Sequence, residues 1–147
     1  MPTATAKDGP SPTVLVADDD GDILKLLSRR LAHRGYRVVT AGSGQAALEQ
    51  AFSAPPDAAV LDGMMPGMEG HEVCAALRAD PRTAAVPVVL LTAKAADADE
   101  REASEAGVDA FIVKPFRIEE LDEKLRGLLA GGLTPGQERD GRFPLSR

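Results

Sequence analysis

Residues 14–31 read VLVADDDGDILKLLSRRL, and this stretch contains a complete structural unit. A continuous apolar run at residues 14–17 stops at three consecutive acidic residues. Apolar side chains then recur at helical spacing as far as Leu31, with basic residues between them. Gly35 follows at the place where the end of a helix favours a residue with positive φ. The stretch therefore predicts a buried strand, an acidic turn and a helix.

The same unit recurs along the chain, with short apolar runs that alternate with amphipathic stretches. This alternation is typical of βα units that build a parallel sheet. The predicted strands cover residues 14–17, 36–40, 58–61, 86–91 and 108–113. The predicted helices cover residues 23–31, 43–52, 73–77, 97–107 and 118–128. The sequence thus predicts a single α/β domain with five strands and five helices.

The two ends of the chain differ from this alternating region. Residues 1–12 are rich in Pro and hydroxyl residues with little to bury, and they predict a flexible leader. Residues 131–147 are rich in Gly, Pro and charge, and they predict a disordered tail. The folded domain is therefore expected at residues 13–130. The 17 residues after Ala130 are too few for a DNA-binding domain with its own core, which needs on the order of 50.

Composition and charge exclude several classes of protein. Lys and Arg number 17 against 23 Asp and Glu, a formal charge of -6, which disfavours direct binding to nucleic acid or to an anionic membrane. No apolar run approaches the roughly 20 residues that span a bilayer, and the first residues lack the apolar segment of a signal peptide. The single cysteine, Cys74, cannot form an internal disulfide and is expected in the core. We expect a cytoplasmic protein.

Polar residues stand at the carboxyl ends of the predicted strands, where open parallel sheets bind their ligands. Clustered carboxylates repel one another unless a hard cation such as Mg²⁺ neutralises them. An ammonium group and a hydroxyl beside such a cation would suit the oxygens of a phosphoryl group, and a lone Asp could be the nucleophile that accepts it. The residues at these strand ends are Asp18, Asp19, Asp20, Asp62, Thr92 and Lys114.

Four motifs together resemble the receiver domain of bacterial two-component response regulators, of the chemotaxis-regulator type. They are VLVADDD at 14–20, VLDGMMPGMEG at 60–70, LLTA at 90–93 and FIVKPF at 111–116. The resemblance covers about residues 13–130. It implies a flavodoxin-like (βα)5 three-layer sandwich whose five-stranded parallel sheet has the order 2-1-3-4-5.

The resemblance also implies a role for each residue at the strand ends. Asp62 would accept the phosphoryl group of a phosphohistidine on a sensor histidine kinase or a phosphotransfer protein. Lys114, in a family-like cis peptide bond with Pro115, would pair with the phosphoryl oxygens. Mg²⁺ or Mn²⁺ would be held by Asp19, Asp62, the backbone carbonyl of Met64 and, through a water, Asp18, with Asp20 as an outer acid.

The resemblance implies a signalling switch rather than an enzyme, although the domain would support its own phosphorylation and slow autodephosphorylation. Thr92 would move toward the phosphoryl group and let Phe111, at a position where Tyr is frequent, turn inward. The fourth helix, fifth strand and fifth helix would then signal to a downstream protein or to a second copy of the chain. The resemblance also implies that Met64 and Lys94 occupy positions that flank the path of a hydrolytic water in this family, and we expect these two side chains to prolong the life of the phosphoaspartate.

Two alternatives belong to other functional classes. A haloacid dehalogenase-like phosphohydrolase also uses an Asp nucleophile, Mg²⁺, a Lys and a hydroxyl, and Asp18 and Asp20 offer its Asp-x-Asp pair. Asp22 stands where that family needs Thr or Val, however, and the chain has no cap domain. A docking module that has lost phosphorylation is the second alternative, and the complete set of strand-end residues argues against it.

Overall fold

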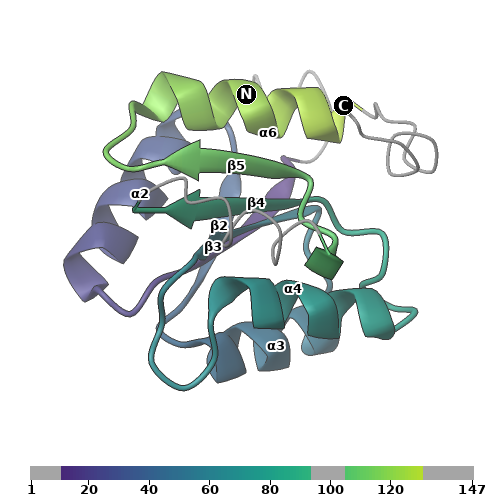
Figure 1. Ribbon diagram of the computed structural model, residues 1–147. Coiled ribbons are helices and arrows are strands. Elements are labelled where there is room, and N and C mark those ends of the chain that lie inside the picture. The colour runs from purple at the N-terminus through teal and green to yellow at the C-terminus, as the bar shows by residue number, and fades with distance from the viewer. Residues whose placement is uncertain (1–10, 94–104, 131–147) are drawn as a thin grey trace.

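The computed structural model describes residues 11–93 and 105–130, in which five parallel strands form one sheet with the order β2-β1-β3-β4-β5. The strands are β1 (Thr13–Ala17), β2 (Arg37–Ala41), β3 (Ala58–Asp62), β4 (Val88–Thr92) and β5 (Ala110–Val113). The helices are α2 (Gly21–His33), α3 (Gly44–Ser53), α4 (Gly70–Ala79) and α6 (Ile118–Leu129). Helices α2 and α6 cover one face of the sheet, and α3 and α4 cover the other (Figure 1).

The predicted α/β class, the three layers and the strand order 2-1-3-4-5 are all confirmed. Four of the five predicted helices lie within the described residues, whereas the acidic helix predicted at 97–107 lies outside them except for its last three residues. The predicted tail and all but the last two residues of the predicted leader also lie outside them. No helix in the described part of the chain is long and apolar enough to cross a membrane.

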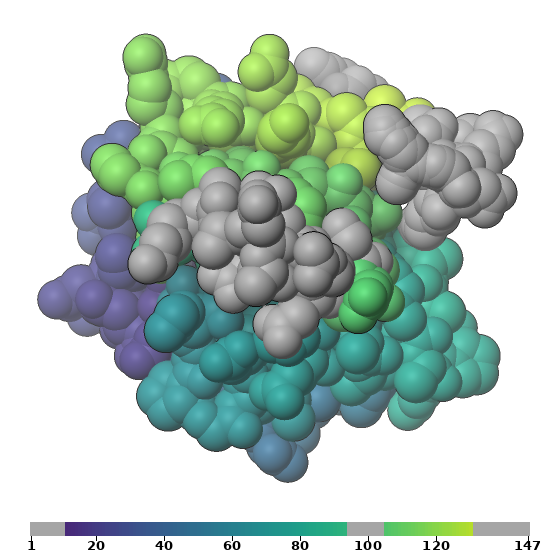
Figure 2. Space-filling view, in the orientation of Figure 1, coloured from purple at the N-terminus to yellow at the C-terminus, as the bar shows by residue number. Residues whose placement is uncertain are grey.

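Two apolar clusters hold the layers together, because successive residues of a strand face opposite sides of the sheet. Leu15 and Leu61 pack toward α3 and α4, while Val16 and Val60 pack toward α2 and α6. All five residues of β3, the central strand, are buried. Figure 2 shows the packed layers from one side, with α6 along one edge of the view and α4 along the other.

Helix α2 begins and ends as its sequence predicts. Asp20 is its N-cap, and the Asp20 carboxylate accepts hydrogen bonds from the N–H groups of Asp22 (2.9 Å) and Ile23 (3.3 Å). Gly35 follows the helix with a φ of 99°, a conformation that is strained for residues with a side chain. These two residues direct the chain from β1 through α2 and back into β2.

Three strands begin one or two residues later than predicted, at Arg37, Val88 and Ala110. The N–H of Tyr36 bonds the carbonyl of Leu31 and so belongs to the end of α2. Arg78 donates to the carbonyls of Val86 (2.6 Å) and Gly107 (2.8 Å), which ties the segments just before β4 and β5 to α4. A backbone bond at the end of α2 therefore delays the start of β2, and side-chain bonds from Arg78 lie just before β4 and β5. The apolar pattern alone could not show either.

Candidate functional site

The sheet brings the predicted strand-end residues to one edge. Asp62 is the last residue of β3 and Thr92 the last of β4, while Asp18 and Lys114 directly follow β1 and β5. Backbone hydrogen bonds continue the strand pairing past the strand ends. The N–H of Asp18 donates to the carbonyl of Ala41 (3.1 Å), and the N–H of Lys114 donates to the carbonyl of Thr92 (2.7 Å). The backbone thus holds these side chains in register.

Three carboxylates form a compact cluster at this edge. Asp18, Asp19 and Asp62 each offer an oxygen within 4.8 Å of the others. Asp18 and Asp62 are buried, with 2% and 6% of their surface exposed, whereas Asp19 is exposed. Buried carboxylates so close together need a positive charge to offset their repulsion, and oxygen ligands of this kind suit Mg²⁺.

The surroundings of Asp18 fit a bound cation. Its Oδ1 accepts a hydrogen bond from the N–H of Asp20 (2.9 Å), whereas its buried Oδ2 has no hydrogen-bond partner among the described residues. Burial raises the pKa of Asp18, and the charges of Asp62 and Asp19 raise it further, against the lowering effects of the Asp20 N–H and Lys114. A buried oxygen without a donor is costly, and a cation at this point would remove the cost.

Lys114 supplies a positive charge next to the cluster. Its Nζ lies 2.9 Å from Oδ1 of Asp62 and 4.0 Å from Oδ2 of Asp18. The Lys114 side chain is 31% exposed, so the ammonium is accessible from solvent as well as from the cluster. An anion beside Asp62 would find one ammonium donor in place.

The loop after Asp62 holds the backbone of that residue rigidly. The N–H of Gly63 donates to the carbonyl of Leu91 (2.7 Å), and the N–H of Gly70 donates to the carbonyl of Gly63 (3.2 Å). A Cβ at Gly70 would lie 2.5 Å from the carbonyl oxygen of Asp62, which is closer than packing allows. Gly70 therefore lets α4 begin directly against the backbone of Asp62.

The other predicted site residues lie around this cluster. Thr92 is half-buried at the end of β4, and Met64 is 68% exposed. Phe111 is half-buried and packs against the cluster of apolar residues under α3 and α4. The bond between Lys114 and Pro115 is cis, as the resemblance implied. Lys94 lies outside the described residues.

Asp20 has a role that the sequence prediction did not assign. It was expected as an outer acid, and it lies outside the three-carboxylate cluster. Its side chain caps α2 while its N–H holds Asp18, so it orients the cluster through the backbone. Its position directly before the first helical residue is the signal that could have revealed the cap.

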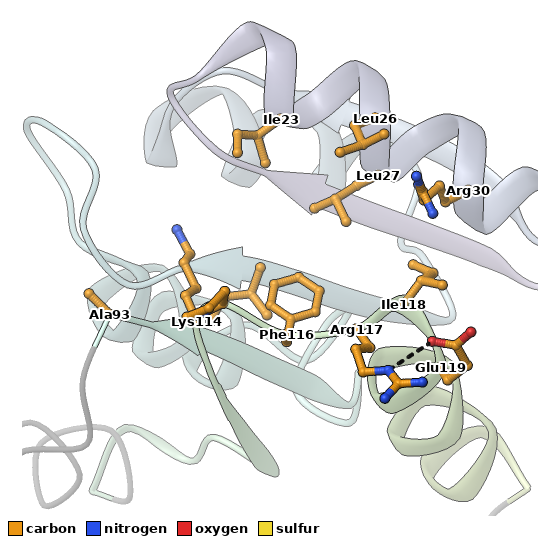
Figure 3. A pocket seen from close by; sticks show the side chains of 12 residues that line it. Ile23, Leu26, Leu27, Arg30, Ala93, Lys114, Phe116, Arg117, Ile118 and Glu119 are labelled. Atoms are coloured by element: carbon orange, nitrogen blue, oxygen red, sulfur yellow. Dashed lines mark ion pairs between the residues drawn. The ribbon is translucent and has the colours of Figure 1, made fainter.

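An apolar groove of about 710 Å³ begins at Lys114 and runs between α2 and the start of α6. Figure 3 shows Ile23, Leu26 and Leu27 of α2 on one side of it and Phe116 and Ile118 on the other. The sequence analysis did not predict this groove, because it forms between segments about 90 residues apart. One residue that lines the groove, Lys114, also donates a hydrogen bond to Asp62, so the groove places an apolar surface next to the carboxylate cluster.

Comparisons with known proteins identify the kind of domain. Residues 14–126 match the family model of the response regulator receiver domain. The transcriptional regulatory protein AfsQ1 of Streptomyces coelicolor is 40% identical over 121 residues, which are 82% of this chain and 52% of AfsQ1. The transcriptional regulatory protein PrrA of Mycobacterium tuberculosis is 44% identical over 81% of this chain and 50% of PrrA. The chain spans about half the length of these curated relatives.

Solved structures agree with the sequence comparisons. The chemotaxis protein CheY4 of Vibrio cholerae is 33% identical, with a TM-score of 0.76 over 79% of this chain and 97% of CheY4. The receiver domain of the sensor histidine kinase PA1611 from Pseudomonas aeruginosa is 27% identical, with a TM-score of 0.76 over 82% of this chain and 98% of that domain. The PA1611 domain was solved with a magnesium ion coordinated in its active site cleft.

Proposed function

Because the chain belongs to the response regulator receiver domain family of two-component signalling, we propose that Asp62 accepts a phosphoryl group and that this modification switches the domain. The observation that carries the proposal is the position of Lys114, whose Nζ lies 2.9 Å from Oδ1 of Asp62 beside the cluster of three carboxylates. A carboxylate that belongs to a candidate cation site and also contacts an ammonium is suited to hold a phosphoryl group.

The proposed reaction is a transfer of the phosphoryl group from a histidine to Asp62. A carboxylate oxygen of Asp62 forms the new bond to phosphorus while the bond from phosphorus to the histidine nitrogen breaks, and that nitrogen keeps the electron pair and takes a proton. Lys114 stays charged and donates to an oxygen of the phosphoryl group. Burial of Asp62 keeps bulk water from its carboxylate.

We propose that Mg²⁺, or Mn²⁺ in its place, is held by Asp19, Asp62 and the backbone carbonyl of Met64, with Asp18 acting through a water. Oδ2 of Asp18, which accepts no hydrogen bond among the described residues, and the PA1611 domain, solved with magnesium in its active site cleft, support this assignment. When bound, the ion would neutralise charge on the phosphoryl oxygens. The N–H of Asp20 holds Oδ1 of Asp18 in place.

We propose that the phosphodonor is a sensor histidine kinase or a phosphotransfer protein, and that it docks in the apolar groove. The groove begins at Lys114, so a helix seated in it would bring its phosphohistidine beside Asp62. The cytoplasm is the location that such a donor predicts. The relatives AfsQ1 and PrrA are named as transcriptional regulatory proteins. We therefore propose control of transcription as the output. The signal would reach it through a downstream partner or through an effector region outside the receiver domain at 13–130.

The proposed switch involves Thr92 and Phe111. Phosphorylation would draw the Thr92 hydroxyl toward the new anion, and the half-buried Phe111 would turn further into the core. Since Phe111 lacks a phenolic hydroxyl, apolar burial alone would favour the inward form. This movement would change how one face of the domain binds a partner or a second copy of the chain. The face is formed by the segment predicted as the acidic helix, by β5 and by α6.

The experiment is an intact-mass measurement after incubation with acetyl phosphate, with and without Mg²⁺, next to an Asp62→Asn variant. We expect a Mg²⁺-dependent gain of one phosphoryl group that the variant lacks. No gain under any condition would contradict the proposal and favour a docking module without phosphorylation. Consumption of acetyl phosphate without an adduct would favour the phosphohydrolase instead.

The lifetime of the phosphorylated form depends on Met64 and Lys94 in this proposal. The exposed Met64 cannot orient a hydrolytic water, because its side chain has no strong acceptor. We expect the double variant Met64→Asn with Lys94→Glu to lose its phosphoryl group about tenfold faster. The decay of the phosphorylated mass after removal of acetyl phosphate measures this rate, and an unchanged decay would contradict the assignment.

A further inference from the structure

Helix α2 is a basic segment of an acidic chain. Its residues, Gly21–His33, contain three Lys or Arg and one Asp, a net charge of +2, whereas the whole chain has a net charge of -6. The remainder of the chain is therefore more acidic than the total suggests. A surface of opposite sign on one helix attracts partners that the rest of the molecule repels.

The cations of α2 lie on its exposed side next to an exposed apolar residue. Leu26, Arg29, Arg30 and His33 follow the spacing i, i+3, i+4 and i+7, which places them on one side of the helix. All four are exposed, and Leu26 retains 44% of its surface in solvent. We call Lys25, Arg29 and Arg30 the basic stripe; within residues 11–93 and 105–130 none of the three has a carboxylate partner.

The basic stripe borders the apolar groove. Leu26 and Arg30 line one side of the groove, and Arg117 lines the other with 84% of its side chain exposed. Glu119, the acidic residue of the lining, already pairs with Arg117 (3.7 Å) and Arg34 (3.6 Å). Figure 3 shows apolar side chains along the groove, with Arg117 paired to Glu119 on one side and Arg30 on the other. Among the described residues, Arg30 has no carboxylate partner, so this side of the rim keeps its positive charge.

The dipole of α2 explains only part of this arrangement. Cations in the last turn of a helix are favourable, and Arg30 and His33 lie there. Lys25 and Arg29 lie earlier in the helix, and the dipole gives no reason for the exposed Leu26. An apolar centre with a basic rim is typical of a protein interface, in which apolar side chains are buried at the centre and charges pair at the edge.

We propose that the basic stripe selects the phosphodonor by charge and that it favours a helix whose apolar ridge is flanked by Asp and Glu. This inference rests on the proposed function, because it concerns the donor that brings a phosphoryl group to Asp62. A protein helix is favoured over a nucleic acid or a membrane surface, since phosphates would neutralise the rim but would leave the groove and Leu26 without an apolar complement.

The test uses one autophosphorylated histidine kinase core in two versions, which carry either Glu or Lys at exposed positions flanking the phosphorylated histidine. We expect the Glu version to phosphorylate the wild-type chain at least about tenfold faster at low salt. In the double variant Arg29→Glu with Arg30→Glu, the Lys version of the kinase should transfer its phosphoryl group faster than the Glu version. The preference should shrink at 1 M salt, where the screening length is about 3 Å.

A matched control separates the location of the charge from its total. The double variant Arg37→Glu with Lys124→Glu changes the net charge by the same amount, and neither residue lines the groove. It should keep the wild-type order of the two kinase versions. Each rate is divided by the rate at which acetyl phosphate labels the same variant, so that any direct effect on Asp62 is removed.

The outcomes distinguish this inference from the proposed function. If acetyl phosphate does not label Asp62, the proposed function fails. If acetyl phosphate labels the chain but the two kinase versions react equally, or keep their order in the Arg29 and Arg30 variant, the selection by charge is wrong and the proposed function stands. A reversal in the control variant would also overturn it, because total charge rather than the basic stripe would then decide.

Discussion

Two buried aspartates of this domain have opposite environments. Asp122 of α6 is 6% exposed and accepts hydrogen bonds from the Tyr36 hydroxyl (2.7 Å), the guanidinium of Arg34 (2.9 Å) and the Nε of Arg126. Burial alone would raise the pKa of Asp122, but these three donors lower it overall. Asp18 is 2% exposed, has one donor on one oxygen and none on the other, and its pKa is raised, chiefly by burial.

The difference shows how one fold uses buried charge for two purposes. Asp122 joins α6 to the end of α2, and its charge is matched by donors of the protein itself. Asp18 is left short of donors at the strand ends, so its ionised form costs stability until a cation binds. A fully partnered carboxylate stabilises the fold, whereas an incompletely partnered one keeps a site open for a ligand.

The variant Asp122→Asn tests the stabilising side of this comparison. It removes the charge that Arg34 and Arg126 share and turns one acceptor oxygen into a donor facing them. We expect the free energy of unfolding to fall by about 2 to 3 kcal/mol. Urea denaturation measures this change, and a loss below about 0.5 kcal/mol would contradict the role assigned to Asp122.

Acid should act through the same residue. The folded-state pKa of Asp122 lies below its ordinary value of 3.8, so its stabilisation is complete above that pH and is lost as the pH falls through the folded-state value. Wild-type stability should therefore drop more steeply below pH 4 than that of Asp122→Asn. Denaturation curves at a series of pH values check the slope, and parallel curves would argue against a lowered pKa.

The variant Asp18→Asn should change the free energy of unfolding in the opposite direction. Without divalent cations, removal of the buried charge should raise the free energy of unfolding by about 1 kcal/mol. The stabilisation that Mg²⁺ gives the wild-type chain should be lost in the same variant. Thermal unfolding with and without Mg²⁺ measures both effects. A destabilised variant in metal-free buffer would show that Asp18 is a structural residue.

The variant Tyr36→Phe tests a single donor to Asp122. It removes one of the donors to Asp122, while Arg34 and Arg126 remain, and we expect a loss of about 1 kcal/mol. In the Asp122→Asn background the same change should cost less, because the two residues interact directly. A double-mutant cycle by urea denaturation measures this coupling, and additive losses would show that the hydroxyl acts elsewhere.

Much of the fold could be predicted because its signals are local. Apolar runs such as 58–61 and helical spacing such as that of α2 depend on residues close together in the chain. The beginnings of β4 and β5 could not be predicted, since Arg78 bonds the carbonyls of Val86 and Gly107 from another element. The acidic helix predicted at 97–107, the Lys94 assignment and the switch of Thr92 and Phe111 remain predictions.

The candidate site could be predicted for a geometric reason. Parallel strands end at one edge of a sheet, so polar residues directly after several strands meet there whatever the details of packing. Asp18, Asp62 and Lys114 therefore converge as their positions in the chain imply. The identity of the strands and of the residues that follow them is enough to locate the site.

Packing between distant segments decided the features that the sequence did not predict, namely the contacts of Asp122, the apolar groove and the exposure of individual charges. The bond between Arg34 and Asp122 joins residues 88 positions apart, and the apolar groove forms only where α2 and the start of α6 come together. Which oxygen of Asp18 lacks a donor, and which cations of α2 lack a partner, depends on how each helix is rotated against the sheet. No local pattern contains that rotation, because the free energy that sets it comes from contacts between elements and not from contacts within them.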